Sequence, residues 1–413
     1  MGSLINLRYL EIDGVPLKEF PQDMSNMKHL QFLCNVILSD KSSGGFKMKR
    51  VAELESLRCI SGLENINDAR EALGANLKDK KGLSKLTLRW NSNAWGADNL
   101  QKEKDIFDAL RPHANLEHLV IENYRGTTFS DWIGDSAFVN LVSISLISCE
   151  NCCTLPPLGQ LPFLKELEIR GCDSVISIGA EIDHTGCLFS HLERLTIIGM
   201  LEWKDWSFSS GAMQEGRIFP LLKELYLDNC PKLNVGFPGY LPSLKHLTIS
   251  HCEQMAVLLP RTQQTVTAPP SLVSVRISNC PVLESLLNWG SHSKVAKLEL
   301  WDSKRLFENH KQWDLHRLFC LEYLSISGWD DDSFLDEGLL PTNLTRLEIY
   351  SSSNLEILND NVFQQLTSLT SLSIYDCEKL RCLPKEGLPT SLSELFILKC
   401  PLLKQCCEKG EED

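Results

Sequence analysis

The sequence lacks the short motifs that mark the common catalytic and nucleotide-binding sites. No glycine is followed by lysine, so the phosphate-binding Walker loop is missing. No His-Glu pair and no Gly-x-Ser-x-Gly segment occurs, which argues against the helix of zinc proteases and the nucleophile elbow of serine hydrolases. We therefore expect a protein that is not an enzyme, with no catalytic residue, no cofactor and no metal site.

Positive charge and long apolar runs are also scarce. The chain has 41 Lys and Arg against 54 Asp and Glu, a net charge of −13, which argues against a nucleic-acid partner held by phosphate contacts. The basic segment 78–81 (KDKK) is interpreted as solvated. No apolar run has the length of a membrane span, and no secretory signal opens the chain. These observations predict a cytoplasmic protein without a membrane span.

Cysteine, in contrast, is abundant, with 16 residues. Seven of them follow the last apolar residue of a predicted strand by three positions, a slot that suits a small, nearly apolar side chain. This recurrence favours a packing column in a reducing compartment over disulfides along the column. The run Cys149-x-x-Cys152-Cys153 resembles half a zinc site without a matching second half. The column consists of Cys149, Cys172, Cys230, Cys252, Cys280, Cys377 and Cys400.

Apolar residues recur in the pattern of a leucine-rich repeat, and segment 369–384 shows it clearly. Leucine or isoleucine occupies positions 369, 372, 374, 380 and 383 with Cys377 between them, which is Leu-x-x-Leu-x-Leu-x-x-Cys-x-Leu. The alternation at 372–374 predicts a short strand with one buried face. Strands are predicted to start, 22 to 33 residues apart, at Leu83, Leu116, Leu141, Leu164, Leu192, Leu222, Leu244, Leu272, Val295, Leu321, Leu344, Leu369 and Leu392.

One such repeat buries too little apolar surface to fold alone, so the copies must stack. The predicted fold is an α/β solenoid, a leucine-rich-repeat horseshoe with a concave parallel β-sheet and a convex side of loops or short helices. We expect a single solenoid over 1–413, with irregular repeats in 1–82, regular repeats in 83–400 and an acidic tail in 401–413.

Within 1–82, we expect an exposed, mobile loop at 39–50 and the longest helix at 67–77, capped by Asn67 or Asp68. A second helix is predicted at 102–110. The chain opens inside a repeat without a cap, which suggests a fragment or the continuation of an upstream segment.

Side chains between the strand leucines point away from the core and form the predicted concave surface. Aromatic residues accumulate there towards the C-terminal end. Exposed rings among charges are typical of protein-binding surfaces. The alternative is that neighbouring loops cover some of these rings. The predicted binding residues are Glu168, Arg170, Tyr226, Asp228, Glu299, Trp301, Tyr323, Glu348, Tyr350, Tyr375 and Phe396.

Several segments are more distinctive than a generic repeat. They include 4–10 with 17–21, 60–65 before 68–70, 83–90, 155–159 (LPPLG), 203–206 (WKDW) and 229–233 (NCPKL). With them the chain resembles the leucine-rich-repeat region of plant intracellular nucleotide-binding immune receptors of the coiled-coil type. The Gly-x-Ile-Pro signature of plant surface receptors is missing. The family's nucleotide-binding and coiled-coil domains are absent from this chain.

The resemblance implies a recognition and autoinhibitory module in plant defence. Its expected partners are a pathogen effector or a guarded host protein, and the nucleotide-binding domain of a full-length receptor. Whether recognition is direct stays open. The alternative is a substrate-recruiting subunit of a ubiquitin ligase, which would need an adaptor-binding helical motif that does not precede Leu4.

Overall fold

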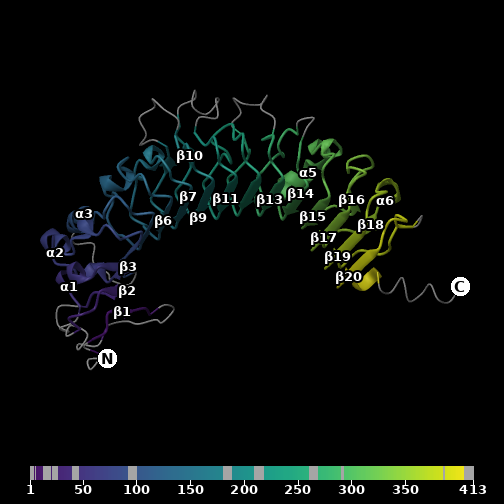
Figure 1. The fold of residues 1–413 in the computed structure, drawn as a ribbon. Helices are drawn as coiled ribbons and strands as arrows, with labels where there is room; N and C mark the ends of the chain where they lie inside the picture. The colour runs from purple at the N-terminus through teal and green to yellow at the C-terminus, as the bar shows by residue number, and fades with distance from the viewer. Residues whose placement is uncertain are drawn as a thin grey trace. The chain divides into compact units, whose positions relative to one another are not determined.

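The structure is a computed structural model that describes residues 4, 6–12, 20, 27–39, 46–91, 100–179, 188–208, 218–259, 268–289, 293–384 and 387–403. The chain divides into two compact units. Unit 1 comprises Met1–Trp203, Ser207–Ala212 and Arg217–Pro220, and unit 2 comprises Lys204–Trp206, Met213–Gly216 and Leu221–Asp413. Each unit contains one strand per repeat, and these strands form parallel ladders (Figure 1).

In unit 1 the parallel strands follow one another in the order of the chain, β1 to β7 and then β9. The short strand β8 lies outside this ladder. The bounds are β1 Tyr9–Leu10, β2 Phe32–Ile37, β3 Ser56–Ser61, β4 Lys85–Arg89, β5 His118–Glu122, β6 Ser143–Ile147, β7 Glu166–Arg170, β8 Ser177–Ile178 and β9 Arg194–Ile198.

Unit 2 repeats the arrangement in the order β11, β12, β13, β14, β15, β17, β19 and β20. A second, short parallel pair joins β16 and β18. The bounds are β10 Asp205–Trp206, β11 Glu224–Asp228, β12 His246–Ser250, β13 Ser274–Ser278, β14 Lys297–Trp301, β15 Tyr323–Ser327, β16 Ser333–Phe334, β17 Arg346–Tyr350, β18 Ile357–Leu358, β19 Ser371–Tyr375 and β20 Glu394–Leu398. In both units, the parallel one-strand-per-repeat fold predicted from the sequence is confirmed.

Helices are short and lie on the side of each unit away from the strands (Figure 1). In unit 1 they are α1 Met48–Glu53, α2 Ala69–Leu73 and α3 Leu100–Ala109, with the 3₁₀ turns η2 Leu63–Asn65, η3 Leu77–Asp79, η4 Asp131–Gly134 and η5 Leu158–Gln160. In unit 2 they are α5 Lys304–Glu308 and α6 Asp360–Gln365, with η7 His310–Gln312 and η8 Leu315–Arg317.

Each regular strand begins two residues after the leucine from which the sequence predicted it to start. The reason is a turn: the backbone N–H of that leucine donates to the carbonyl three residues earlier, as from Leu344 to Pro341 at 3.3 Å and from Leu369 to Leu366 at 3.0 Å. Both leucines are fully buried. The first leucine of the repeat therefore anchors the turn that enters the strand.

The chain leaves each ladder strand of unit 2, from β11 to β20, through a residue with positive φ. This residue is Asn229, Asn279 or Asp376 in three of the repeats, with φ of 52°, 52° and 58°. Its N–H donates to the last strand carbonyl of the next repeat, at 2.9–3.1 Å in these three cases. The left-handed residue therefore extends the ladder by one bond and turns the following side chain back into the core.

That following position is the cysteine slot, and the predicted packing column is confirmed. All seven cysteines are buried as free thiols. From Cys230 to Cys400 their Sγ atoms donate to the carbonyl two residues earlier at 3.4–3.5 Å. Ser303 and Ser352 replace cysteine in two repeats and make the same bond at 2.9 and 3.0 Å.

Two local predictions in unit 1 were wrong. The loop expected at 39–50 contains the start of α1, because Phe46, Met48 and Val51 form a buried apolar face; positions 40–45 lie outside the described residues. The helix expected at 67–77 extends only over α2, and the ten-residue α3 is longer. Asp68 does cap α2, accepting the Glu71 N–H at 2.9 Å, but Gly74 ends it. Of the acidic tail, 404–413 lie outside the described residues.

Candidate binding surface on the repeat strands

The strands of unit 2 pair without a shift in register, so their outward-facing side chains form columns. Positions two and four of each strand from β11 to β19 are buried aliphatic residues, and positions one, three and five face away from them. The first column is Glu224, His246, Ser274, Lys297, Tyr323, Arg346, Ser371 and Glu394. The middle column is Tyr226, Thr248, Arg276, Glu299, Ser325, Glu348, Ser373 and Phe396, and the last is Asp228, Ser250, Ser278, Trp301, Ser327, Tyr350, Tyr375 and Leu398.

The predicted binding residues divide between the two units. Glu168 and Arg170 lie on β7 of unit 1, where Arg170 Nη2 is 2.8 Å from Glu168 Oε1 and Ser145 Oγ donates to Glu168 Oε2 at 3.2 Å. The other predicted residues all belong to the columns of unit 2, namely Tyr226, Asp228, Glu299, Trp301, Tyr323, Glu348, Tyr350, Tyr375 and Phe396.

Arg276 and Glu299 form a bidentate ion pair between neighbouring strands. Arg276 Nε lies 2.8 Å from Glu299 Oε2, and Nη2 lies 3.0 Å from Oε1. Hydrogen bonding to this carboxylate raises the pKa of Arg276 above its ordinary value. The guanidinium also lies 5.1 Å from the centre of the Trp301 ring, whose Nε1 donates to Ser325 Oγ at 3.1 Å. A two-bond fork of this kind fixes the orientation of the guanidinium as well as its position.

Glu348 accepts hydrogen bonds from its own strand, β17, and from the preceding strand of the ladder, β15. Tyr350 Oη donates to Glu348 Oε2 at 2.8 Å, Tyr323 Oη donates to the same oxygen, and Arg346 Nε lies 3.1 Å from Oε1. Burial, and then hydrogen bonding to Glu348, raise the pKa of Tyr323 and of Tyr350 above the ordinary value. Both phenols therefore remain protonated donors at neutral pH.

Aromatic rings connect these two ionic centres. Lys297 Nζ lies 4.9 Å and the Arg346 guanidinium carbon 5.9 Å from the centre of the Tyr323 ring. Tyr350 and Tyr375 stack with ring centres 4.9 Å apart and planes inclined by 8°. We call the whole group the ion–ring cluster; it comprises Arg276, Lys297, Glu299, Trp301, Tyr323, Arg346, Glu348, Tyr350 and Tyr375.

Two of the residues expected on the open surface are in fact covered. Glu299 and Glu348 are buried, although their strand positions face away from the aliphatic core. Their bonded partners on the same strand and on the preceding strand of the ladder cover them. The three cations of the cluster, Arg276, Lys297 and Arg346, were not among the predicted residues. The column pattern could have identified them, because they occupy the same outward positions as the predicted aromatics.

The predicted residues at the margins of unit 2 lie in different surroundings. Tyr226 Oη donates to Asp228 Oδ2 at 3.5 Å, and His251 Nδ1 lies 2.9 Å from Asp228 Oδ1. Phe396 is exposed on β20, as is its neighbour Leu398. The structure therefore brings together six predicted residues in the ion–ring cluster, which are Glu299, Trp301, Tyr323, Glu348, Tyr350 and Tyr375.

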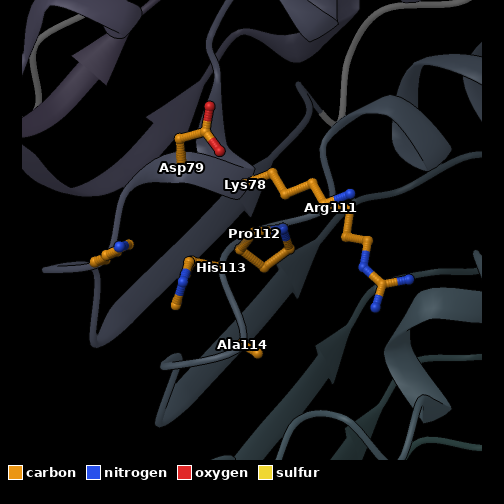
Figure 2. Close-up of a pocket in the computed structure, with 7 residues that line it drawn as sticks. Lys78, Asp79, Arg111, Pro112, His113 and Ala114 are labelled. Carbon is orange, nitrogen blue, oxygen red and sulfur yellow. The ribbon is translucent and has the colours of Figure 1, made fainter.

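A cavity of about 570 Å³ in unit 1 is lined by Lys78, Asp79, Lys81, Arg111, Pro112, His113 and Ala114. Lys78 extends toward Arg111, whereas Asp79 points away from His113 (Figure 2). Lys78 and Lys81 are exposed, and Arg111 Nη2 already lies 2.6 Å from Asp135 Oδ2. This cavity is therefore a weaker candidate for binding than the ion–ring cluster.

Segment 78–81 was expected to be solvated, and for Lys80 this prediction is wrong. Lys80 is buried, and its Nζ donates to the carbonyls of Ala52, at 3.3 Å, and of Leu54. These carbonyls lie at the C-terminal end of α1, where helical carbonyls lack partners of their own. Burial lowers the pKa of Lys80 below its ordinary value.

Metal binding finds no support among the described residues. No group of three or more His, Cys, Asp or Glu side chains within them is placed to hold an ion. In the half-site suggested by the sequence, Cys149 and Cys152 are buried, and the Cys152 Sγ donates to the Gly126 carbonyl at 3.1 Å. Nor is any helix in this part of the chain long and apolar enough to cross a membrane.

Comparison with known proteins shows which other proteins contain similar repeats. A family described as R13L1/DRL21 LRRs matches residues 46–172. RPP13-like protein 1 of Arabidopsis thaliana is 30% identical over 381 residues, which are 87% of this chain and 31% of that protein. The disease resistance protein RGA2 of Solanum bulbocastanum is 31% identical over 48% of this chain and 23% of its own length. The chain is a leucine-rich-repeat region of the kind found in plant disease resistance proteins. It spans less than a third of the length of these relatives.

Among solved structures, the TLR13 chain of a TLR13–ssRNA13 complex is similar to this resistance-protein repeat region. It shares 17% sequence identity, with a TM-score of 0.47, over 97% of this chain and 62% of that one. A leucine-rich-repeat protein of Leptospira interrogans shares 17% identity, with a TM-score of 0.45, over 91% of this chain and 92% of its own. At this distance the likeness concerns the repeat fold alone.

Proposed function

We propose that this repeat region is the recognition module of a plant immune receptor, which binds a pathogen effector or an effector-modified host protein. In the same proposal it restrains the receptor's nucleotide-binding domain until recognition, acts in the cytoplasm and performs no chemistry of its own. The kinship with disease resistance proteins supports the general role. The ion–ring cluster is the observation that supports a binding surface on the strands of unit 2.

The cluster has the composition and the preorganisation of a protein-binding centre. Tryptophan, tyrosine and arginine dominate binding hot spots, and here they come from β13, β14, β15, β17 and β19. Bonds to Glu299 and Glu348 hold Arg276, Tyr323 and Tyr350 in place before a partner arrives. Side chains that are already ordered lose less conformational entropy on binding.

The test is a receptor that contains this chain as its repeat region, expressed in leaf tissue together with the effector that activates it. Combined substitution of Trp301→Ala, Tyr350→Ala and Tyr375→Ala removes three half-buried rings of the cluster. We expect effector-triggered cell death to be lost at unchanged receptor abundance, because hot-spot rings contribute about 2 kcal/mol or more each.

Phe319→Ala is the matched control, since Phe319 is an exposed ring of unit 2 outside the strand columns. This variant should respond like the wild type. A full response from the triple variant at normal abundance would refute the assignment of the cluster.

A further inference from the structure

We propose that the ion–ring cluster binds an acidic segment of its protein partner, whose carboxylates contact Lys297, Arg346 and Arg276. This inference rests on the proposed function and specifies the chemistry of the partner. It follows from how charge is layered on this face of unit 2.

The carboxylates of the cluster lie beneath its cations. The side chains of Glu299 and Glu348 are 5% and 10% exposed, whereas those of Arg276, Lys297 and Arg346 are 40%, 43% and 52% exposed. The three cations also exceed the two carboxylates by one positive charge. A partner therefore meets local positive charge on a chain whose net charge is −13.

The hydrogen-bonding capacity of the cluster leads to the same partner. Both oxygens of Glu299 accept from Arg276, and both oxygens of Glu348 accept from its neighbours. A basic partner would have to displace these bonds to reach a carboxylate. These pairs engage Nε and Nη2 of Arg276 but only Nε of Arg346. Lys297 Nζ lies 3.4 Å from Glu299 Oε2, but an ammonium has three N–H groups. The remaining N–H groups of Lys297 and of the two guanidinium groups can therefore donate to incoming acceptors.

Lys297, Tyr323 and Arg346 form a row across three adjacent strands in the first column. At ~4.8 Å between strands, the two cations lie about 10 Å apart with the ring between them. An extended segment advances ~3.3 Å per residue, so carboxylates at alternate positions recur about every 7 Å. Flexible glutamate side chains cover the remaining difference, and a partner ring can contact Tyr323 or Trp301 in the same crossing.

Cations among aromatic rings also occur in surfaces that bind single-stranded nucleic acid, where bases stack on the rings. The charge balance disfavours that ligand here. Two carboxylates lie directly beneath the three cations, and phosphate binding depends on an excess of positive charge along the backbone path. A protein segment, whose acidic groups are fewer and further apart, fits this arrangement better.

The experiment uses fluorescein-labelled peptides and this chain in a fluorescence anisotropy titration. The acidic probe is acetyl-Gly-Glu-Phe-Glu-Tyr-Glu-Gly; the neutral probe has glutamine and the basic probe lysine in place of glutamate. We expect the acidic probe to bind on the order of fivefold to tenfold more tightly than the neutral one at low ionic strength. High salt should remove most of this preference.

The double variant Lys297→Gln, Arg346→Gln should lose the preference for the acidic probe while keeping the circular dichroism spectrum of the wild type. The control variant Lys304→Gln, Lys311→Gln removes the same charge from exposed residues outside the columns of unit 2 and should retain it. Equal losses in both variants would attribute the effect to net charge and contradict the inference.

Three further outcomes would overturn the acidic-partner inference, and none needs a variant to fold. They are equal binding of the acidic and neutral probes by the wild-type chain, tighter binding of the basic probe, and displacement of the acidic probe by an oligothymidine of equal charge. If one of these occurs while the ring substitutions still abolish cell death, the recognition surface stands and only the chemistry of its partner is wrong.

Discussion

At the scale of single residues, Lys80 is the charged group whose burial has the clearest consequence. Its ammonium contacts the carbonyls of Ala52 and Leu54 rather than a carboxylate. The charged form therefore bears an uncompensated desolvation cost, which lowers its pKa from 10.5. The benefit is that Lys80 supplies hydrogen-bond donors to the carbonyls at the C-terminal end of α1.

We expect Lys80 to make the stability of the chain depend on pH under alkaline conditions. Below its folded pKa, the cost of burying the charge is fully present. Between that pKa and 10.5 the unfolded chain binds more protons, so stability rises with pH. The thermal midpoint of the wild type should therefore rise relative to that of Lys80→Met as the pH increases toward 10.5.

Lys78→Met provides the control, because Lys78 is exposed on the same segment. Its midpoint should keep a constant difference from the wild type across this pH range. Parallel curves for the wild type and Lys80→Met would show that Lys80 titrates as freely as a surface lysine.

At the scale of the repeat element, the left-handed residue after each ladder strand of unit 2 determines how the chain turns into the core. Asn229 illustrates the constraint, with φ of 52° and an N–H that donates to the Ser250 carbonyl at 3.1 Å. Asparagine and glycine tolerate this conformation, whereas a β-branched residue crowds its own backbone there.

Asn229→Val should lower the free energy of unfolding by about 1–2 kcal/mol, because valine is strained at positive φ. Asn229→Gly should change it by a few tenths of a kcal/mol only, since glycine adopts this region freely. Denaturant titration of the two variants measures the difference. Equal stabilities would mean that the turn can relax to negative φ without losing its hydrogen bond.

The sequence predicted those features of a repeat that depend on residue spacing within that repeat. The spacing of Leu369, Leu372 and Ile374 sufficed for the strand, and the cysteine slot followed from counting. The burial of Glu299 was beyond such reasoning, because it depends on the conformation that the Arg276 side chain adopts in the preceding repeat, 23 residues away. Helix bounds failed for a related reason: the buried face of α1 depends on neighbouring repeats, and Gly74 shortens α2.

At the scale of the molecule, each unit is a row of repeats in which a strand contacts the strands immediately before and after it. The stability of such a row is approximately a sum of repeat terms and nearest-neighbour terms. Damage to one repeat should therefore weaken its neighbours first. The ion–ring cluster draws on strands β13 to β19, so the recognition proposed for it would depend on that local order.

Leu247→Ala tests this expectation in unit 2. Leu247 is buried on β12 and pairs with Leu225 and Val275, so its truncation should cost about 2–5 kcal/mol. Hydrogen exchange should accelerate most in β11, β12 and β13, and least in β17 and β19. Thr248→Ala, at the adjacent outward position, should leave exchange nearly unchanged. Uniform acceleration from β11 to β19 would instead indicate that unit 2 opens as one cooperative body, and binding would then depend on every repeat equally.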